Sequence, residues 1–172
     1  DVDPGAGTTA VDTSGVLKMS LGTGPFEQTF QHGFRWTEYS RIGMLFNTNS
    51  LPDTLSITSV KLSIKIKSWS QSTGAGWDPN PEFALYGFEN ANNSAIAVSD
   101  YIHLKNTQLS DGKDSSDWKN VFDERLEFTL TDTTWIQPAS PGISAVGIRA
   151  TQEFTGAHGW VDNQTHHVNF YG

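Results

Sequence analysis

Short stretches of alternating apolar and polar residues run through most of the chain. The clearest is segment 60–67, VKLSIKIK, in which Val, Leu and Ile alternate without error with Lys and Ser. Such alternation is typical of a β-strand that rests one face on a core and turns the other to water. The same pattern recurs in 126–131, 146–151 and 168–171, and shorter candidate strands occupy 16–21, 34–39, 42–46, 83–88 and 95–98.

Loops rich in Gly, Pro, Asp and Ser separate these segments, chiefly at 72–81, 111–117 and 138–142. The sequence has no apolar stripe with the period and length of a helix, and one short helical turn is expected at 99–104 or 118–122. About eight or nine short strands divided by turns predict a single all-β domain. Its expected architecture is a two-sheet antiparallel sandwich of jelly-roll type.

The first 15 residues differ from the rest of the chain, because they are rich in Gly, Thr and Asp and have Val2 and Val11 as their large apolar residues. Such a segment cannot build a core by itself. Residues 1–15 are therefore predicted to be an arm outside the domain. Three forms of this arm stay open: a linker, a disordered tail, or a strand that becomes ordered against another segment or another molecule. Residues 16–172 then form the sandwich domain. The chain starts with Asp, as expected of a mature secreted form whose signal peptide has been removed.

Residues 39–62, YSRIGMLFNTNSLPDTLSITSVKL, carry a run of residues in the order of a known family signature. The matching positions are Arg41, Phe46, Leu51-Pro52, Ile57-Thr58-Ser59 and Leu62. Weaker elements follow in the family's order at 99–101, 126–136, 146–149 and 167–171. The chain thus resembles the DNRLRE, or disaggregatase-related, β-sandwich domains of secreted and cell-surface proteins. This resemblance implies a sandwich fold and an extracellular or cell-surface location.

The family layout continues to a last strand, whereas this chain stops at Gly172. If the layout applies, one strand position near the C-terminus is empty. An empty position leaves backbone N–H and C=O groups unpaired and a strip of core exposed. We predict that the arm fills it, either within the chain or by strand addition to a neighbouring subunit. Val2 and Val11 are then the arm's candidate assembly residues.

The charge balance narrows the range of partners. The chain has 11 Lys+Arg against 19 Asp+Glu, which gives a net charge of -8. Nucleic-acid binding requires clustered cations. The cationic cluster of this chain, Lys61, Lys65 and Lys67, occupies alternate positions of one predicted strand and is interpreted as its wet face. We therefore expect no nucleic-acid partner, and no apolar run approaches the roughly 20 residues of a membrane-spanning helix.

Side chains that could carry catalysis are scattered. Cysteine is absent, which excludes disulfides and Cys-ligated metals. His166 and His167 are adjacent, so in a strand they point to opposite faces and cannot chelate one ion. No nucleophile elbow, phosphate loop or paired-carboxylate pattern occurs, and we expect neither enzymatic activity nor a cofactor. Asp111, Asp114 and Asp117 are weak calcium candidates, because their loop lacks the spacing of a calcium site and a solvated turn is the commoner role.

The chain is rich in aromatic residues, with 6 Trp, 10 Phe and 4 Tyr. Trp69, Trp77 and Trp160 lie in or beside polar loops, where an exposed ring can stack on a sugar. The alternative is that these large rings cap the open ends of the sandwich core. Trp36 and Trp135 lie in strand-like or family-core positions and are assigned to the core.

Two further sets of residues are expected to serve modification or structure. Asn92 and Asn163 stand in sequons and are candidate glycosylation sites in an extracellular protein. Arg41 and Arg149 match positions of the family and are expected to organise the structure through buried hydrogen bonds.

Two functions from different classes follow from these features. The first is a non-catalytic extracellular structural protein that assembles with itself, by strand exchange, into a surface filament or sheath. The second is a carbohydrate-binding or adhesive module of a secreted or cell-surface protein, with a polysaccharide as its partner. The arm and the expected empty strand position favour the first.

Overall fold

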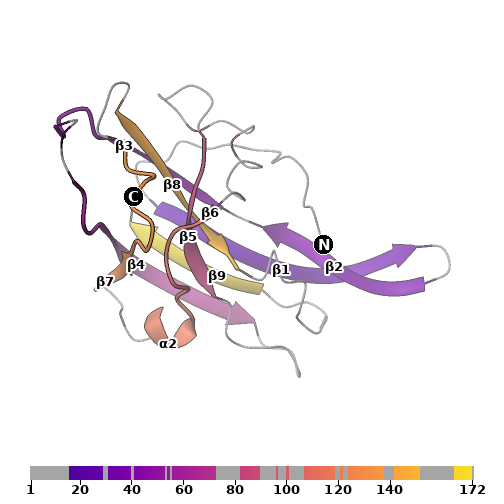
Figure 1. Cartoon of the computed structure of the whole chain (residues 1–172). Helices are drawn as coiled ribbons and strands as arrows, with labels where there is room; N and C mark the ends of the chain where they lie inside the picture. The colour runs from indigo at the N-terminus through magenta and orange to yellow at the C-terminus, as the bar shows by residue number, and fades with distance from the viewer. Residues whose placement is uncertain are drawn as a thin grey trace.

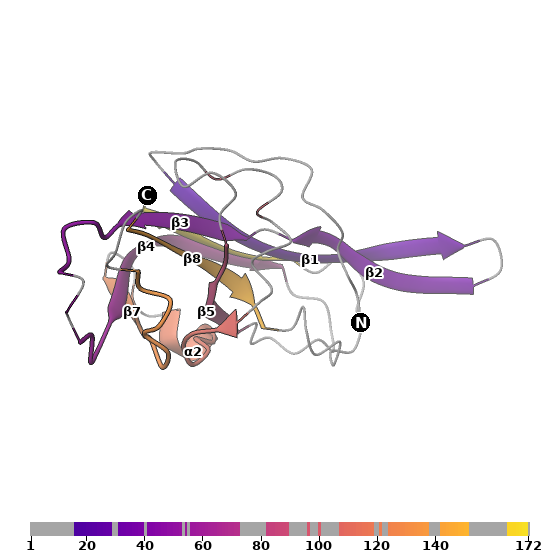
Figure 2. The same cartoon turned by 45° about the horizontal axis from the view of Figure 1, so that its top comes forward.

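The computed structural model describes residues 16–28, 31–39, 41–52, 54, 56–72, 82–89, 96, 100, 107–118, 121, 124–137, 142–151 and 165–171. In these residues strands dominate and form two antiparallel sheets, as Figures 1 and 2 show. The prediction of an all-β, two-sheet antiparallel fold is confirmed. The nine strands of the described part agree with the expected number, while the jelly-roll type stays a prediction.

The larger sheet has five strands in the order β2-β1-β9-β4-β7. The strands are β1 (Val16–Gln28), β2 (Gln31–Tyr39), β9 (Thr165–Tyr171), β4 (Lys61–Ser72) and β7 (Arg125–Thr129). Both edges of β9 are paired, since β1 lies on one side of it and β4 on the other. Within the described part, a further strand could therefore join this sheet at β2 or β7 but not beside the C-terminal strand.

The smaller sheet has four strands in the order β3-β8-β5-β6. They are β3 (Ile42–Asn47), β8 (Ile143–Ala150), β5 (Phe83–Gly87) and β6 (Thr107–Gln108). A short helix, α2 (Ser115–Trp118), begins three residues before the helical turn expected at 118–122. Asp100, within the alternative range 99–104, is also helical. No helix in the described residues is long and apolar enough to cross a membrane.

The main core lies between the two sheets. The larger sheet contributes Ile64, Ile66, Leu126, Phe128, Val168 and Phe170, and the smaller sheet contributes Ile42, Phe83, Leu85, Val146, Ile148 and Ala150. Full burial of each Val, Leu, Ile or Phe side chain in this set stabilises the fold by roughly 1.5–3 kcal/mol. The alternation predicted for 60–67 is confirmed, because Ile64 and Ile66 are buried while Lys61 and Lys67 are exposed.

A β-bulge in β4 changes which positions face the core. Ile66 lies opposite Phe170, but Ser68 rather than Lys67 lies opposite Asn169. Lys67 is thus the extra residue, and the inward positions shift by one beyond it. Trp69 consequently joins the core side and packs against the main cluster.

The outer face of the smaller sheet is also buried, although its alternating sequence predicted one wet face. Every residue of β5 is buried, and β8 is buried from Ser144 to its end. Phe88 and Ala145 form a second apolar cluster with Leu45 and Ile96 packed against it. A covering layer therefore lies over this face, and small residues in the sheet leave room for it. At Gly43, for example, a Cβ atom would lie 3.1 Å from the Cδ1 atom of Ile96.

Candidate functional site

The β1–β2 hairpin is longer than the sheet that holds it. Residues 16–22 of β1 pair with β9, whereas residues 23–28 pair with β2 and, among the described strands, with no other. The register of the hairpin shifts between Gly22 and Thr23, at the point where β9 ends its pairing. Figures 1 and 2 show this end of the hairpin reaching beyond the other strands. We call residues 23–28 and 31–36 the hairpin extension.

The hairpin extension is a two-stranded segment with no third strand among the described residues. Two strands alone are marginally stable in water, and stable sheets need a third strand or a packed face. The sequence of the extension includes Phe26, Phe34 and Trp36, and Gly33 lies opposite Phe26 in the register. Its outer backbone edges have no partner strand in the described part of the chain. Such edges are templates for pairing with another chain.

Strand β3 is a second edge of the same kind. It pairs with β8 on one side and with no described strand on the other. Its sequence, IGMLFN, has neither a charge nor a proline, the devices that usually protect an edge strand from pairing. The side chain of Phe46, at the end of this strand, is 39% exposed. Among the described residues, this edge of the smaller sheet is therefore apolar and has no pairing strand.

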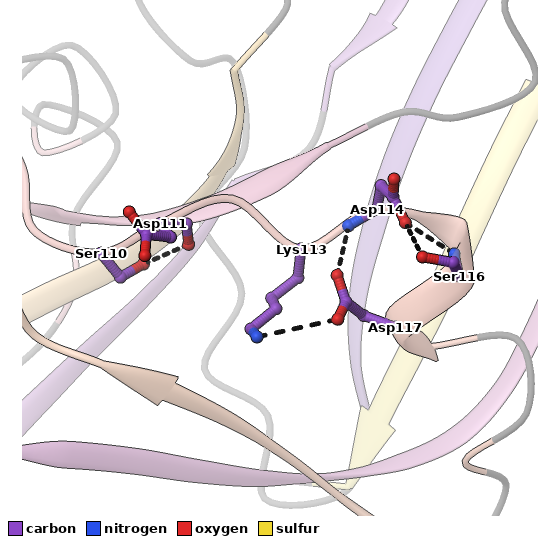
Figure 3. Close-up of polar contacts among 6 residues, drawn as sticks. All are labelled: Ser110, Asp111, Lys113, Asp114, Ser116 and Asp117. Carbon is purple, nitrogen blue, oxygen red and sulfur yellow. Dashed lines mark hydrogen bonds and ion pairs between the residues drawn. The ribbon is translucent and has the colours of Figure 1, made fainter.

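The loop that holds the calcium candidates is organised as a helix cap (Figure 3). The Asp114 carboxylate accepts hydrogen bonds from the Ser116 amide at 2.7 Å and the Ser116 hydroxyl at 2.6 Å. In return, the Asp114 amide donates to the Asp117 carboxylate at 3.0 Å. This reciprocal pattern is a variant of the capping box, in which the N-cap carboxylate bonds the amide of the second helical residue and aspartate replaces the usual glutamate. The cap explains why α2 begins at Ser115, and D-x-x-D was the sequence signal for it.

The carboxylates of Asp114 and Asp117 serve local structure. Asp117 also lies 3.7 Å from the Lys113 ammonium, and Asp111 is exposed. Within the described residues, no group of three or more His, Asp or Glu side chains could hold a metal ion. Calcium binding stays a prediction, but Asp114 and Asp117 already use carboxylate oxygens in the cap.

The cap holds a core residue in place. Trp118, the last residue of α2, is 1% exposed and lies edge-on to Trp69, with ring centroids 5.7 Å apart. Its ring also meets Phe83 at 6.3 Å. Of the two roles considered for Trp69, the structure thus supports core capping. Trp135 also packs against the core, as predicted.

Replacing Asp114 by alanine is expected to lower the free energy of unfolding by about 1 kcal/mol, because the first turn of α2 loses its acceptor. Urea unfolding followed by tryptophan fluorescence measures this loss. Asp111→Ala is the matched control in the same loop and should change the value by less than about 0.5 kcal/mol. Equal effects of the two substitutions would contradict the capping role.

The outer face of the larger sheet carries a feature that the sequence pattern did not show. Lys65 and Lys67 place their ammonium nitrogens 5.1 and 5.7 Å from the ring centroid of Tyr171. Farther along the same face, Lys61 forms an ion pair with Glu127 at 3.2 Å. The prediction that the lysines form the wet face of their strand is therefore confirmed, but two of them gather around one aromatic ring.

Several predicted site residues lie outside the described residues. They are Trp77 and Trp160, the sequon residues Asn92 and Asn163, and the arm residues Val2 and Val11. Their roles in sugar binding, glycosylation and assembly stay predictions.

Comparisons of this chain with protein-family models, curated proteins and solved structures found no match. The resemblance to DNRLRE domains therefore stays a prediction.

Proposed function

We propose that this chain is a non-catalytic, extracellular structural subunit that assembles with itself by strand addition into a filament or sheath. The observation that carries the proposal is the hairpin extension, a two-stranded segment that continues past the sheet with no third strand among the described residues. A segment of this kind is stabilised when another chain supplies the missing neighbour.

The edge of β3 is the complementary surface. It is apolar, lacks protective charges and belongs to the opposite sheet from the hairpin extension. Pairing of an extension from one subunit with β3 of the next would join two different surfaces. Contacts between different surfaces repeat head to tail, so the assembly is open-ended unless its rotation closes a ring.

The arm of residues 1–15 is a second candidate donor of a strand. It precedes β1 directly, so its end is anchored where the larger sheet begins. In this proposal the arm and the hairpin extension both reach a neighbouring subunit. Deleting residues 1–14 tests the arm separately from the hairpin, because β1 stays intact.

Shortening the hairpin is the main test. Thr23 and Trp36 are partners in the register, so an Asn-Gly turn can replace residues 24–35 and close the hairpin there. The shortened protein is expected to lose its oligomers, as measured by gel filtration and negative-stain microscopy. The melting temperature of its monomer should stay within about 4 °C of the parent, because the pairing of β1 with β9 is kept.

A point substitution tests the receiving edge. Phe46→Lys adds a protective charge to β3 and is expected to reduce assembly strongly. Thr129→Lys, at an exposed position of the edge strand β7 in the other sheet, is its matched control and should leave assembly intact. Oligomers of unchanged size in both the shortened protein and Phe46→Lys would overturn the proposal.

A further inference from the structure

We propose that the outer face of the larger sheet holds a binding site for an acidic, carboxylate-bearing saccharide, formed by Lys65, Lys67 and Tyr171. We call these three residues the lysine–tyrosine surface. This inference is independent of self-assembly, because it rests on other residues and another face.

The register of β4 and β9 brings the three residues together. Ile66 lies opposite Phe170, and both point into the core. Their neighbours Lys65, Lys67 and Tyr171 therefore point to the opposite, outer face. The bulge at Lys67 increases the local twist of β4 and aims this side chain, like that of Lys65, at the same ring. Both ammonium nitrogens lie within the roughly 6 Å range of cation–π attraction.

The charge of this surface is opposite to that of the whole chain. Strands β4 and β7 carry four cations, Lys61, Lys65, Lys67 and Arg125, and one carboxylate, that of Glu127, while Glu124 directly precedes β7. The chain as a whole has a net charge of -8. Glu127 is engaged by Lys61, at the far end of the face from Tyr171. The lysine–tyrosine surface is thus a local cationic patch that attracts an anion.

The aromatic ring selects among anions. The Tyr171 side chain is 42% exposed, so its ring offers apolar contact beside the two ammonium groups. A neutral sugar would use the ring alone, and an inorganic anion would use the lysines alone. A uronic acid presents an apolar C–H face and a carboxylate in one unit, and it can use both.

The experiment measures binding of polygalacturonate to the full chain by affinity gel electrophoresis, with a neutral galactan and dextran sulfate as comparison polymers. Polygalacturonate is expected to retard the protein, while the neutral galactan is not. Tyr171→Ala and the double variant Lys65→Gln/Lys67→Gln should each weaken binding by about tenfold. Lys61→Gln removes the same charge from the same strand and face, away from Tyr171, and should change binding less than about twofold.

Three results would overturn the inference. One is the absence of retardation by polygalacturonate. Another is equal retardation of the parent protein and of Tyr171→Ala by polygalacturonate. The third is that dextran sulfate binds as strongly as polygalacturonate and that only the lysine variant weakens this binding. Either of these two results would show attraction by charge alone. The substituted side chains lie on the wet face, so each variant is expected to fold, and near-ultraviolet circular dichroism verifies this.

Discussion

Replacing Phe128 by alanine is expected to lower the free energy of unfolding by about 3–5 kcal/mol. Phe128 is 0% exposed and lies in β7, opposite Leu62 of β4. Its neighbours Leu126 and Leu130 are buried on the same face, so the ring is enclosed by the core on every side. Truncation to alanine removes the favourable free energy of transferring the ring from water to the core. It also leaves a cavity that the packed sheets can fill only in part.

Urea unfolding followed by tryptophan fluorescence measures this effect. Phe46→Ala is the matched control, because Phe46 lies at the end of an edge strand and is 39% exposed. This substitution should lower the free energy of unfolding by less than about 1.5 kcal/mol. Similar losses for the two variants would show that the interior does not lie between the two sheets as described.

Replacing Arg149 by alanine is expected to lower the free energy of unfolding by about as much as Phe128→Ala, roughly 3–5 kcal/mol. The side chain is 2% exposed on the covered outer face of β8, beside Ala84 of β5. Its guanidinium carbon lies 5.9 Å from the ring centroid of Tyr86, and the Tyr86 hydroxyl donates to Gln108 at 3.3 Å. Alanine removes the contact with the Tyr86 ring and leaves the volume of a long, fully buried side chain unfilled, so both losses add to the effect.

Arg149→Met separates the charge from the volume, because methionine fills much of the same space without a charge. Its cost should be well below that of Arg149→Ala, since a buried ionic group replaced by an apolar side chain of similar size is often close to neutral. Thermal unfolding of both variants makes the comparison. A loss below about 1 kcal/mol for Arg149→Ala would contradict a structural role for this arginine.

The sequence predicts most strands because their periodicity survives in the fold. Segment 60–67 has its inward and outward faces as expected, and candidate strands 16–21, 34–39 and 42–46 are all found. Periodicity alone does not place Trp69 on the core side of β4. The bulged residue Lys67 shifts the alternation by one position, so that the residues beyond it face the opposite way to the one expected. The covered face of β8 was also missed, since Gly147 and Arg149 look like wet-face residues until a second layer is known to lie over them.

The candidate sites were less predictable, because they depend on pairing between distant segments. Lys65 and Tyr171 meet only through the register of β4 with β9, which no local pattern contains. The length of the hairpin was concealed by Gly22, Gly24, Pro25 and Gly33, residues that usually mark turns and end strands. Here they lie within paired strands.

Sedimentation velocity of the unmodified protein, from about 1 to 100 µM, tests self-assembly most directly. Strand addition between different surfaces predicts a broad, concentration-dependent distribution of species far heavier than the 18.9 kDa chain. A single sharp boundary at the mass of one chain, unchanged across the whole concentration range, would contradict it.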